Sequence, residues 1–334
     1  MDDVIGSFSL WQTLKYHQPK NFFNFKLELY DAGHVLGSAL LKFTFAEGKT
    51  MLFSGDIGNS PSVLLPDVEK VEGLDYLLVE SVYGDRNHED KKLRDEKFRD
   101  VVEDSIKRGG TLLIPAFSLE RTQVMLYELD NLFESGKLPA VPVYLDSPLA
   151  IRITAIYEKV STLFNEESRA ELKRGDDLFK FPKLKETARV QDSREIANVS
   201  GAKIIIAGSG MSTAGRILGH EEMFLPDGNS TVLLAGFQAL GTLGRQLEEG
   251  AKEGVIKGNK VPVRARIEKI DGFSAHADSN ALVDFVSHSQ KTLKKVFVAM
   301  GEPRSAIFLA QRLRDELNVD AVVAEKGKTY ELDL

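Results

Sequence analysis

The chain has 334 residues, 43% of them hydrophobic, and a formal net charge of −7. It is longer than one average domain and apolar enough to bury a substantial core, so two lobes are the expected organisation. The acidic balance argues against a uniformly basic nucleic-acid binder, although it leaves room for a local basic groove. The absence of cysteine excludes disulfides and thiolate metal ligands, so a transition metal would need histidine and carboxylate donors.

The sequence contains no stretch that approaches the roughly eighteen unbroken apolar residues of a membrane span. The first residues, MDDVIGSFSL, lack the basic region with which a signal peptide starts. We therefore expect a cytoplasmic protein that does not enter a membrane.

The N-terminal part of the chain changes from a helical to a strand period. Apolar residues at three- and four-residue spacings predict an amphipathic helix over residues 1–18. A period of two follows and predicts an antiparallel meander. Its strands are expected at KLELYDAG (26–33), GSALLKFTF (37–45) and KTMLFSG (49–55). A buried strand, DYLLVES (75–81), and a charged helix over 86–108 come next, and Gly109-Gly110 ends the helix.

The middle of the chain alternates short apolar strands with helical segments. The strands are expected at 111–117, 141–147, 202–210 and 231–237, with helices at 118–133 and 243–254. This alternation is typical of a parallel sheet with crossover helices.

After VRARIEKI (263–270) the pattern gives a helix, a strand, a second helix and a last strand. These elements are expected at 277–288, 294–300, 305–318 and 321–326. The meander at one end and the α/β run in the middle indicate a domain inserted within a domain. The boundaries are predicted at 1–84 for the first segment, 85–262 for the insertion and 263–334 for the returning segment.

Several polar residues follow apolar runs and precede a glycine or another small residue, a position where reacting groups collect in such sheets. They are His34, Asp56, Glu80, Asp146 and His276. Met300, in VFVAMGEP, occupies the same kind of place. Each residue alone could simply cap a helix or satisfy a turn. Together they indicate a hydrolytic metal site, which needs His and carboxylate ligands converging from separate strand ends.

A series of motifs runs through the whole chain in one order. The motifs are DAGHVLGSA, LFSGDIG, LLVESVYGDR, IPAFSLERTQ, VYLDSPLA, IIAGSGMSTAGR, GFQALGTLGR, IDGFSAHAD and VFVAMGEP. By them the chain resembles the β-CASP proteins of the metallo-β-lactamase superfamily, nucleases that include the endonuclease of pre-mRNA 3′-end processing. The resemblance implies an α/β fold: a metallo-β-lactamase αββα sandwich, here incomplete, with an inserted β-CASP domain built on a parallel sheet flanked by helices.

The resemblance also implies roles at the site. His34 would be a zinc ligand, and Asp56 the carboxylate that bridges two zinc ions. The two ions would share a hydroxide that attacks the phosphorus of single-stranded RNA. Glu80 matches an orienting acid, and His276 matches the histidine that assists protonation of the leaving oxygen. The alternative for the last two is a purely structural hydrogen bond.

A loop in the insertion matches a segment that lines the RNA path in the family. Its residues are Ser209, Gly210, Met211 and Arg216. The first serine of the family's segment is Gly208 here. As a nucleotide-binding glycine fingerprint the loop is weak, because its glycines do not have the G-x-G-x-x-G spacing.

The sequence departs from the family pattern in two places. The family carries an HxHxDH signature that supplies most of the zinc ligands, and these 334 residues contain none. The strand that ends in VFVAMGEP ordinarily ends in the last histidine ligand, and here that position is Met300. A thioether is a poor zinc ligand beside imidazole and carboxylate, so apolar packing is the favoured interpretation of this methionine.

Only His34 and Asp56 remain of the implied ligand set, fewer than the three or four side chains of a stable zinc site. The sequence therefore predicts that zinc binds weakly or not at all and that this chain does not cleave RNA. It also predicts an uncovered apolar face on the sandwich sheet. A further segment of a longer protein, a partner or second copy, or the first helix could cover that face.

Two functional hypotheses follow, and a third is weaker. The chain could be part of a β-CASP ribonuclease, or a non-catalytic relative that binds RNA or a nuclease partner. A decaying gene product is a third option, against which the many intact motifs weigh. Candidate phosphate contacts are Arg121, Arg152, Arg216 and Arg245. Ion pairs or solvated faces are the alternative for each of these arginines.

Overall fold

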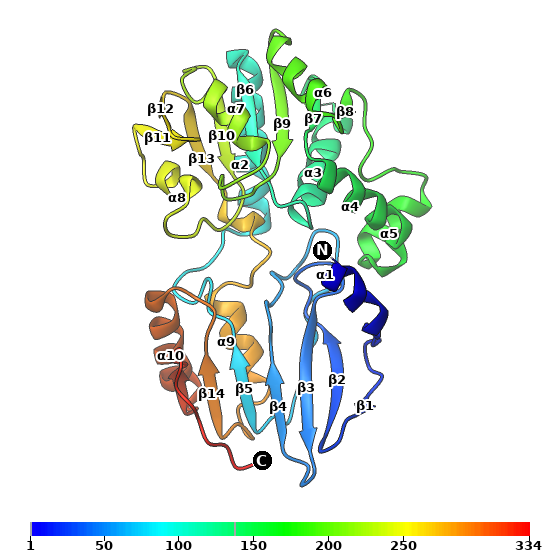
Figure 1. The fold of residues 1–334 in the computed structure, drawn as a ribbon, viewed down its shortest axis with the longest axis vertical. Coiled ribbons are helices and arrows are strands. Elements are labelled where there is room, and N and C mark those ends of the chain that lie inside the picture. The colour runs from blue at the N-terminus through cyan, green and yellow to red at the C-terminus, as the bar shows by residue number, and fades with distance from the viewer. Residues whose placement is uncertain (1, 137) are drawn as a thin grey trace. The chain divides into compact units, whose positions relative to one another are not determined.

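The computed structural model describes residues 2–136 and 138–334, which form two compact units (Figure 1). Unit 1 comprises the chain up to Pro61 together with Asp67–Asn87 and His276–Leu334. Unit 2 comprises Ser62–Pro66 and His88–Ala275. Unit 2 is therefore an insertion between two segments of unit 1.

Unit 1 is built on one seven-stranded mixed sheet. Its strands are β1 (Lys20–Asn21), β2 (Phe25–Asp31), β3 (Ala39–Phe45), β4 (Thr50–Phe53), β5 (Tyr76–Val79), β14 (Lys295–Val298) and β15 (Ala321–Val323), in the order β1-β2-β3-β4-β5-β14-β15. Strands β1 to β4 pair antiparallel, which confirms the predicted meander. From β4 to β15 the pairs are parallel.

Two helices cover one face of this sheet, α9 (Ser279–Ser287) and α10 (Pro303–Leu317) (Figure 1). Helix α9 begins where the side chain of Asp278 accepts a hydrogen bond from the Ala281 amide, and α10 begins at Pro303, whose fixed φ suits a first helical turn. The strands and helices share one buried core. It includes Leu40, Leu52, Leu77, Val79, Val296, Val298, Leu282, Val286, Leu309 and Leu313.

The opposite face of the sheet is apolar and only partly buried. The antiparallel register places Leu27 opposite Phe43 and Leu29 opposite Leu41 on this face. The rings of Phe43 and Phe53 lie 5.3 Å apart, and Phe53 is 37% exposed. Within the described residues unit 1 has no second sheet to pack here. This unit is one sheet and one helical layer of an αββα sandwich, as the sequence predicts.

The helix at the N-terminus is shorter than the sequence predicts. Helix α1 (Asp2–Ser7) is followed by a 3-10 turn, η1 (Phe8–Leu10), instead of one helix to residue 18. The hydroxyls of Ser7 and Ser9 donate to backbone carbonyls three residues earlier, a local bond that competes with the helix. Trp11 is 72% exposed, so this segment lacks the packing that stabilises an amphipathic helix.

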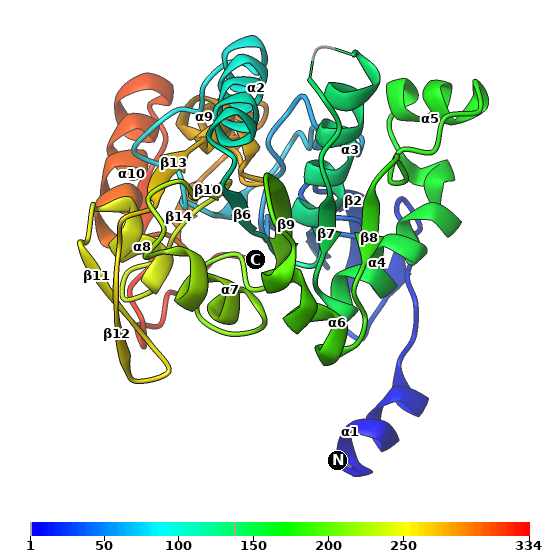
Figure 2. The same ribbon diagram turned by 90° about the horizontal axis from the view of Figure 1, so that it is seen from above.

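Unit 2 is a six-stranded parallel sheet with helices on both faces. Its strands are β6 (Thr111–Pro115), β7 (Val143–Leu145), β8 (Leu184–Glu186), β9 (Lys203–Ala207), β10 (Thr231–Leu234) and β13 (Arg266–Lys269), in the order β13-β10-β6-β9-β7-β8. The helices are α2 (Lys91–Arg108), α3 (Arg121–Glu134), α4 (Pro148–Lys159), α5 (Glu166–Lys173), α6 (Val190–Glu195), α7 (Ile217–Phe224) and α8 (Leu243–Glu248). Helices α7 and α8 lie on one side of the central strands, with α2 and α3 on the other (Figure 2). Short 3-10 turns are η2 (Ser161–Leu163), η3 (Ile196–Asn198) and η4 (Asp271–Phe273).

Two details of unit 2 differ from the sequence prediction. The helix expected over 243–254 ends at Glu248, because Gly250 takes a left-handed φ of 84° and turns the chain into a hairpin. The hairpin strands are β11 (Glu253–Ile256) and β12 (Asn259–Pro262). Residues 263–275, assigned to the returning segment, lie in unit 2 because β13 pairs with β10. None of the helices that the structure describes is long and apolar enough to cross a membrane.

Three buried carboxyl groups of unit 2 make the folded state sensitive to pH. Burial raises the pKa of Glu120, Glu128 and Glu221 to about 7 in each case, although the hydroxyl of Tyr157 donates to Glu120 Oε2 at 2.5 Å. An acid whose pKa is raised by folding binds its proton more tightly in the folded protein than in the unfolded chain. Folding is therefore favoured at low pH and weakened as pH rises through these values.

We expect the melting temperature to fall by a few degrees between about pH 5 and pH 7.5, as these three groups ionise in the folded state. Calorimetric scans across that range test this. The Glu120→Gln variant, neutral at every pH, should show a smaller fall than the unsubstituted protein. A melting temperature that rises across the same range would contradict the assignment.

Candidate functional site

The loop that carries His34 leaves the end of β2. Asp31 Oδ1 accepts a hydrogen bond from the Gly33 amide at 2.8 Å, and Ser38 Oγ accepts from the amide of His34 at 3.1 Å. These side-chain contacts satisfy backbone donors within the turn. The imidazole of His34 is consequently held at the edge of the sheet with most of its surface buried.

Gly58 joins this loop to the loop after β4 that carries Asp56. Its amide donates to the carbonyl of Ala32 at 2.8 Å. A Cβ at position 58 would lie 2.1 Å from the carbonyl oxygen of Gly33, far inside van der Waals contact. Gly58 also forms an isolated antiparallel bridge with His276. Gly58, the last residue of GDIG, therefore has to be glycine, because a side chain there would push apart the loops that carry His34 and Asp56.

These three loops bring together one cluster of possible metal donors. His34 Nε2 lies 3.8 Å from Asp56 Oδ2, and the rings of His34 and His276 are 4.5 Å apart. One donor atom from each of these three residues lies within 4.8 Å of the other two. The side chain of Asp56 is 49% exposed, so the cluster is open to solvent. Sequence analysis placed His34 and Asp56 together, and the structure adds His276 to them.

Glu80, at the end of β5, is fully buried and lies beside this cluster. His276 Nδ1 lies 3.1 Å from Glu80 Oε2, within hydrogen-bond distance. The amide of Ile57 donates to Glu80 Oε1 at 2.6 Å, and the amide of Val82 donates to Oε2 at 3.4 Å. The buried carboxylate thus fixes the ring of His276 and ties the Asp56 loop to the end of β5.

Met300 does not pack as the sequence analysis expects. It lies two residues beyond β14, in the left-handed region with a φ of 60°, and it is 49% exposed. Its neighbour Gly301 comes so close to Ser81 that a Cβ would be 2.3 Å from the Ser81 carbonyl oxygen. The tip is therefore held against the segment that follows Glu80, and the methionine fills no core position.

Imidazole and carboxylate are the donors that a divalent transition metal uses. His34, Asp56 and His276 fit a single ion of this kind. They do not fit a centre of two ions, which would require further donors on both metals beyond one aspartate shared between them. These three side chains alone therefore do not provide the two-metal arrangement that hydrolysis by this chemistry needs.

In unit 2 the loop 208–216 between β9 and α7 is braced from within. Ser209 Oγ accepts from the amides of Thr213 and Ala214 at 3.0 and 3.2 Å. Gly210 is buried against the ring of Phe117. Met211 Sδ accepts from the amide of Ala239 at 3.4 Å. The loop is a folded element whose outermost residues, 213–215, are exposed.

Arg216 is the residue of this loop whose environment differs most from the RNA-binding prediction. Its Nη1 donates to Asp146 Oδ1 and to the carbonyl of Thr187, both at 2.6 Å, and its Nη2 donates to the carbonyl of Ala188 at 2.8 Å. His220 Nε2 lies 2.7 Å from the other oxygen of Asp146. Sequence analysis missed His220, although its spacing of four from Arg216 on a helix was a usable signal.

Asp146 is the centre of this network and is fully buried. Burial alone would raise its pKa, but hydrogen bonds from His220, Ser193, Thr187 and Arg216 outweigh burial and lower the pKa to about 2. Arg216 is therefore engaged within the folded structure of unit 2, and its contact with RNA stays a prediction.

The other three arginines named as phosphate contacts differ in exposure. Arg121 is buried, and Arg245 donates to Glu249 at 2.6 Å and to the carbonyl of Gln238 at 3.3 Å. Arg152, on α4, is exposed. Arg152 is thus the arginine of this group that is best placed to meet a ligand from solvent.

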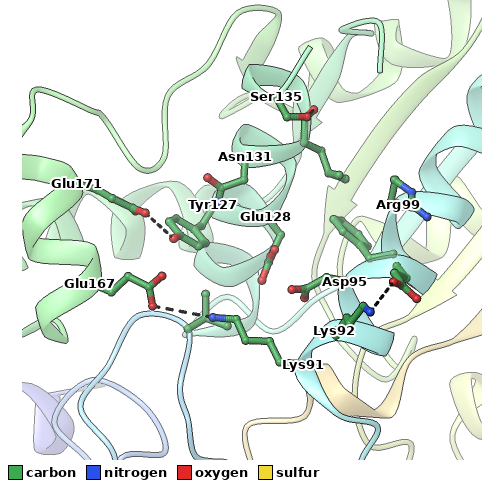
Figure 3. A pocket seen from close by; sticks show the side chains of 14 residues that line it. Lys91, Lys92, Asp95, Arg99, Tyr127, Glu128, Asn131, Ser135, Glu167 and Glu171 are labelled. Atoms are coloured by element: carbon green, nitrogen blue, oxygen red, sulfur yellow. Dashed lines mark hydrogen bonds and ion pairs between the residues drawn. The ribbon is translucent and has the colours of Figure 1, made fainter. Parts of the chain in front are cut away.

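A hollow of about 660 Å³ lies in unit 2 between α2, α3 and α5 (Figure 3). Five of its lining residues are acidic, three are basic, and none is a histidine. Two of the basic groups face carboxylates, with Lys91 3.9 Å from Glu167 and Lys92 4.0 Å from Glu96. An excess of carboxylates is unfavourable for RNA phosphates, so this hollow does not add to the RNA-binding prediction.

Unit 1 and its inserted parallel domain have the layers of an incomplete metallo-β-lactamase sandwich with a β-CASP insertion. Comparison with known families agrees. Residues 122–247 match the Beta-Casp domain, and residues 260–324 match the Zn-dependent metallo-hydrolase RNA specificity domain.

Individual proteins are similar over most of this chain. Ribonuclease TTHA0252 of Thermus thermophilus is 32% identical over 93% of the chain and 71% of its own length. The RNase J-like protein of Methanocaldococcus jannaschii is 33% identical over 98% of the chain and 76% of its own length. Transcription termination factor FttA of Methanosarcina mazei is 30% identical over 92% of the chain, which spans 50% of that protein. The chain belongs to the β-CASP family of metallo-β-lactamase-fold ribonucleases.

Replacing Asp146 tests the role assigned to its network. Asp146→Asn leaves the partly buried guanidinium of Arg216 without the counter-charge of a fully buried carboxylate, so we expect the free energy of unfolding to fall by about 3 kcal/mol. Denaturant titration measures this. The matched control is Asp192→Asn, whose ion pair with exposed Arg189 is screened by solvent and should contribute little to stability. Equal effects of the two substitutions would refute a structural role for Asp146.

Proposed function

We propose that this protein binds single-stranded RNA as a member of its RNA-processing family, and that the 334-residue chain by itself does not hydrolyse it. The membership and the match to an RNA specificity domain support the choice of ligand. The count of donors at the cluster supports the absence of hydrolysis. His34, Asp56 and His276 suffice for one weakly held ion, whereas the family's reaction requires two zinc ions sharing a hydroxide.

A zinc-dependent ribonuclease is the second candidate, and the contact between Glu80 and His276 supports it. The buried carboxylate of Glu80 orients His276, as a proton donor to a leaving oxygen would require. Donors supplied from outside these 334 residues, by a longer chain, a second copy or a nuclease partner, would complete the centre. The two candidates differ in whether this chain alone cleaves RNA.

The first experiment separates binding from cleavage. Labelled single-stranded RNA is mixed with the protein and Zn²⁺, then anisotropy reports binding and gel electrophoresis reports cleavage. We expect salt-sensitive binding without cleavage, with affinity falling as salt rises from about 50 to 200 mM because bound phosphates release counterions. RNA fragments that form with protein and Zn²⁺, but not with Asp56→Ala, would favour the second candidate.

Arg152 provides a matched test of the RNA surface. Arg152→Ala removes an exposed cation, and one lost phosphate contact should reduce the salt slope of log affinity by about one. The control is Arg174→Ala, at another exposed arginine of unit 2, which should leave the slope unchanged. Equal salt slopes in Arg152→Ala and the unsubstituted protein would show that Arg152 does not contact RNA phosphates.

The metal content tests the donor count directly. We expect less than one zinc per chain after dialysis, measured by plasma mass spectrometry, because three side chains in a solvent-open cluster bind weakly. Met300→His should raise that content, since imidazole is a better zinc donor than a thioether and histidine tolerates the left-handed backbone of this position. Met300→Leu, similar in size but without a donor, is the control.

Two zinc ions per chain in the unsubstituted protein would overturn the proposed function. An equal zinc content in Met300→His and Met300→Leu would show instead that position 300 does not reach the metal.

A further inference from the structure

A second cluster of carboxylates lies in unit 2, on different elements from the donors of unit 1. Asp130 and Glu134 are four residues apart on α3, so they share one face of that helix. Asp176 lies in the loop after α5, where Gly175 takes a left-handed φ of 93°. One oxygen from each of these three residues lies within 4.8 Å of the other two.

Asp130 is the inner member of the cluster and has no hydrogen-bond partner for one of its oxygens. Its side chain is 4% exposed, and Oδ1 is buried without a partner among the residues that the structure describes. A buried carboxylate oxygen left without a donor is unfavourable by about 1–3 kcal/mol or more. Asp176 is partly buried and Glu134 is exposed, so the cluster leads from solvent down to Asp130.

The surroundings of Asp130 add negative charge. Burial and the neighbouring carboxylates of Glu134, Asp176, Asp177 and Glu171 raise the pKa of Asp130 to about 7. Glu171 Oε1 accepts a hydrogen bond from the hydroxyl of Tyr127 at 3.2 Å (Figure 3). Its other oxygen, Oε2, is buried without a hydrogen-bond partner among the described residues.

The cations nearby are engaged elsewhere. Lys180 lies 3.3 Å from Asp177 and 2.8 Å from Glu158, and Arg174 lies 4.0 Å from Glu171. Among the described residues no lysine, arginine or histidine forms an ion pair with Asp130, Glu134 or Asp176. Within the described part of the chain, the cluster thus holds carboxylate charge that no basic side chain pairs with.

From this geometry we propose that Asp130, Glu134 and Asp176 bind a hard divalent cation, Ca²⁺ or Mg²⁺. Carboxylate oxygens are the donors that both ions prefer, and waters complete their coordination shells. The donor set contains no imidazole, which distinguishes it from the cluster of His34, Asp56 and His276 and disfavours zinc. The ion would link the loop after α5 to α3 and neutralise the charge around Asp130.

This proposal does not depend on the proposed function, because its residues lie apart in sequence from the donors of unit 1 and its measurement needs no RNA. The probes are CaCl₂ and MgCl₂, added separately to the full 334-residue protein after treatment with a chelator. Thermal unfolding and isothermal titration are recorded for the unsubstituted protein and for the variants.

We expect the melting temperature to rise with the concentration of at least one of the two cations, because a ligand that binds the folded state stabilises it by mass action. Asp130→Asn should abolish this rise. Without cations the same variant should melt higher than the unsubstituted protein, since it removes an uncompensated buried charge. Asp176→Asn, at a less buried position, should abolish the rise as well and guards against a folding defect of the first variant.

Asp56→Asn is the matched control, since it removes a carboxylate donor from the cluster in unit 1 and should retain the full cation-dependent rise. A rise lost in Asp56→Asn and kept in Asp130→Asn would place the ion in unit 1 and refute the proposal. An unsubstituted protein whose melting temperature responds to neither cation would also refute it, and would show that Asp130 is neutralised by a proton instead.

Discussion

The arrangement of unit 1 at its polar edge depends on one buried carboxylate. Glu80 has no solvent contact, so its charge must be met by donors from the protein. Those donors come from three separate segments: the amide of Ile57 after β4, the amide of Val82 after β5, and the ring of His276. The same carboxylate therefore positions the Asp56 loop, the end of its own strand and the histidine. Removing it would leave the chemistry-bearing loops without their common anchor.

The sequence predicts the fold of this protein well where periodicity is strong. The antiparallel meander, the strand that ends just before Glu80 and the parallel alternation of the middle domain all follow from apolar spacing. It predicts the ends of helices less well, because packing or a single turn residue determines where a helix stops. The helix predicted over residues 1–18 is too long because its apolar residues have helical spacing yet remain exposed to solvent, as Trp11 does. The end of α8 depends on the left-handed backbone of Gly250, and the sequence does not show it because glycine also occurs within helices.

The candidate site shows a similar division. Sequence alone identifies His34, Asp56, Glu80 and His276 as strand-end residues, and the structure places them in one region of unit 1. The sequence does not reveal that His276 is close enough to His34 to bind the same metal ion, because the distance between them depends on how three loops pack. Nor does it reveal that Arg216 is already engaged with Asp146, seventy residues away in the chain. A motif identifies a residue type, and only the fold identifies its partner.

Unit 2 holds two buried carboxylates in contrasting surroundings. In the Asp146 network four donors surround the charge, so the pKa falls to about 2 and the group stays ionised. At Asp130, in the same unit, burial and acidic neighbours act without a compensating donor and the pKa rises to about 7. Burial is common to both groups, and the presence of donors decides the direction of the shift.

Gly58 has a further consequence for how variants of this protein would be interpreted. A methyl group at position 58 would collide with the backbone of Gly33. The loops that carry His34 and Asp56 can therefore approach this closely only because Gly58 has no Cβ. A substitution there would separate the loops while leaving every donor side chain intact. Loss of metal affinity in such a mutant would therefore result from displaced loops. An inherited substitution at this position could abolish metal binding even though His34, Asp56 and His276 are all still present.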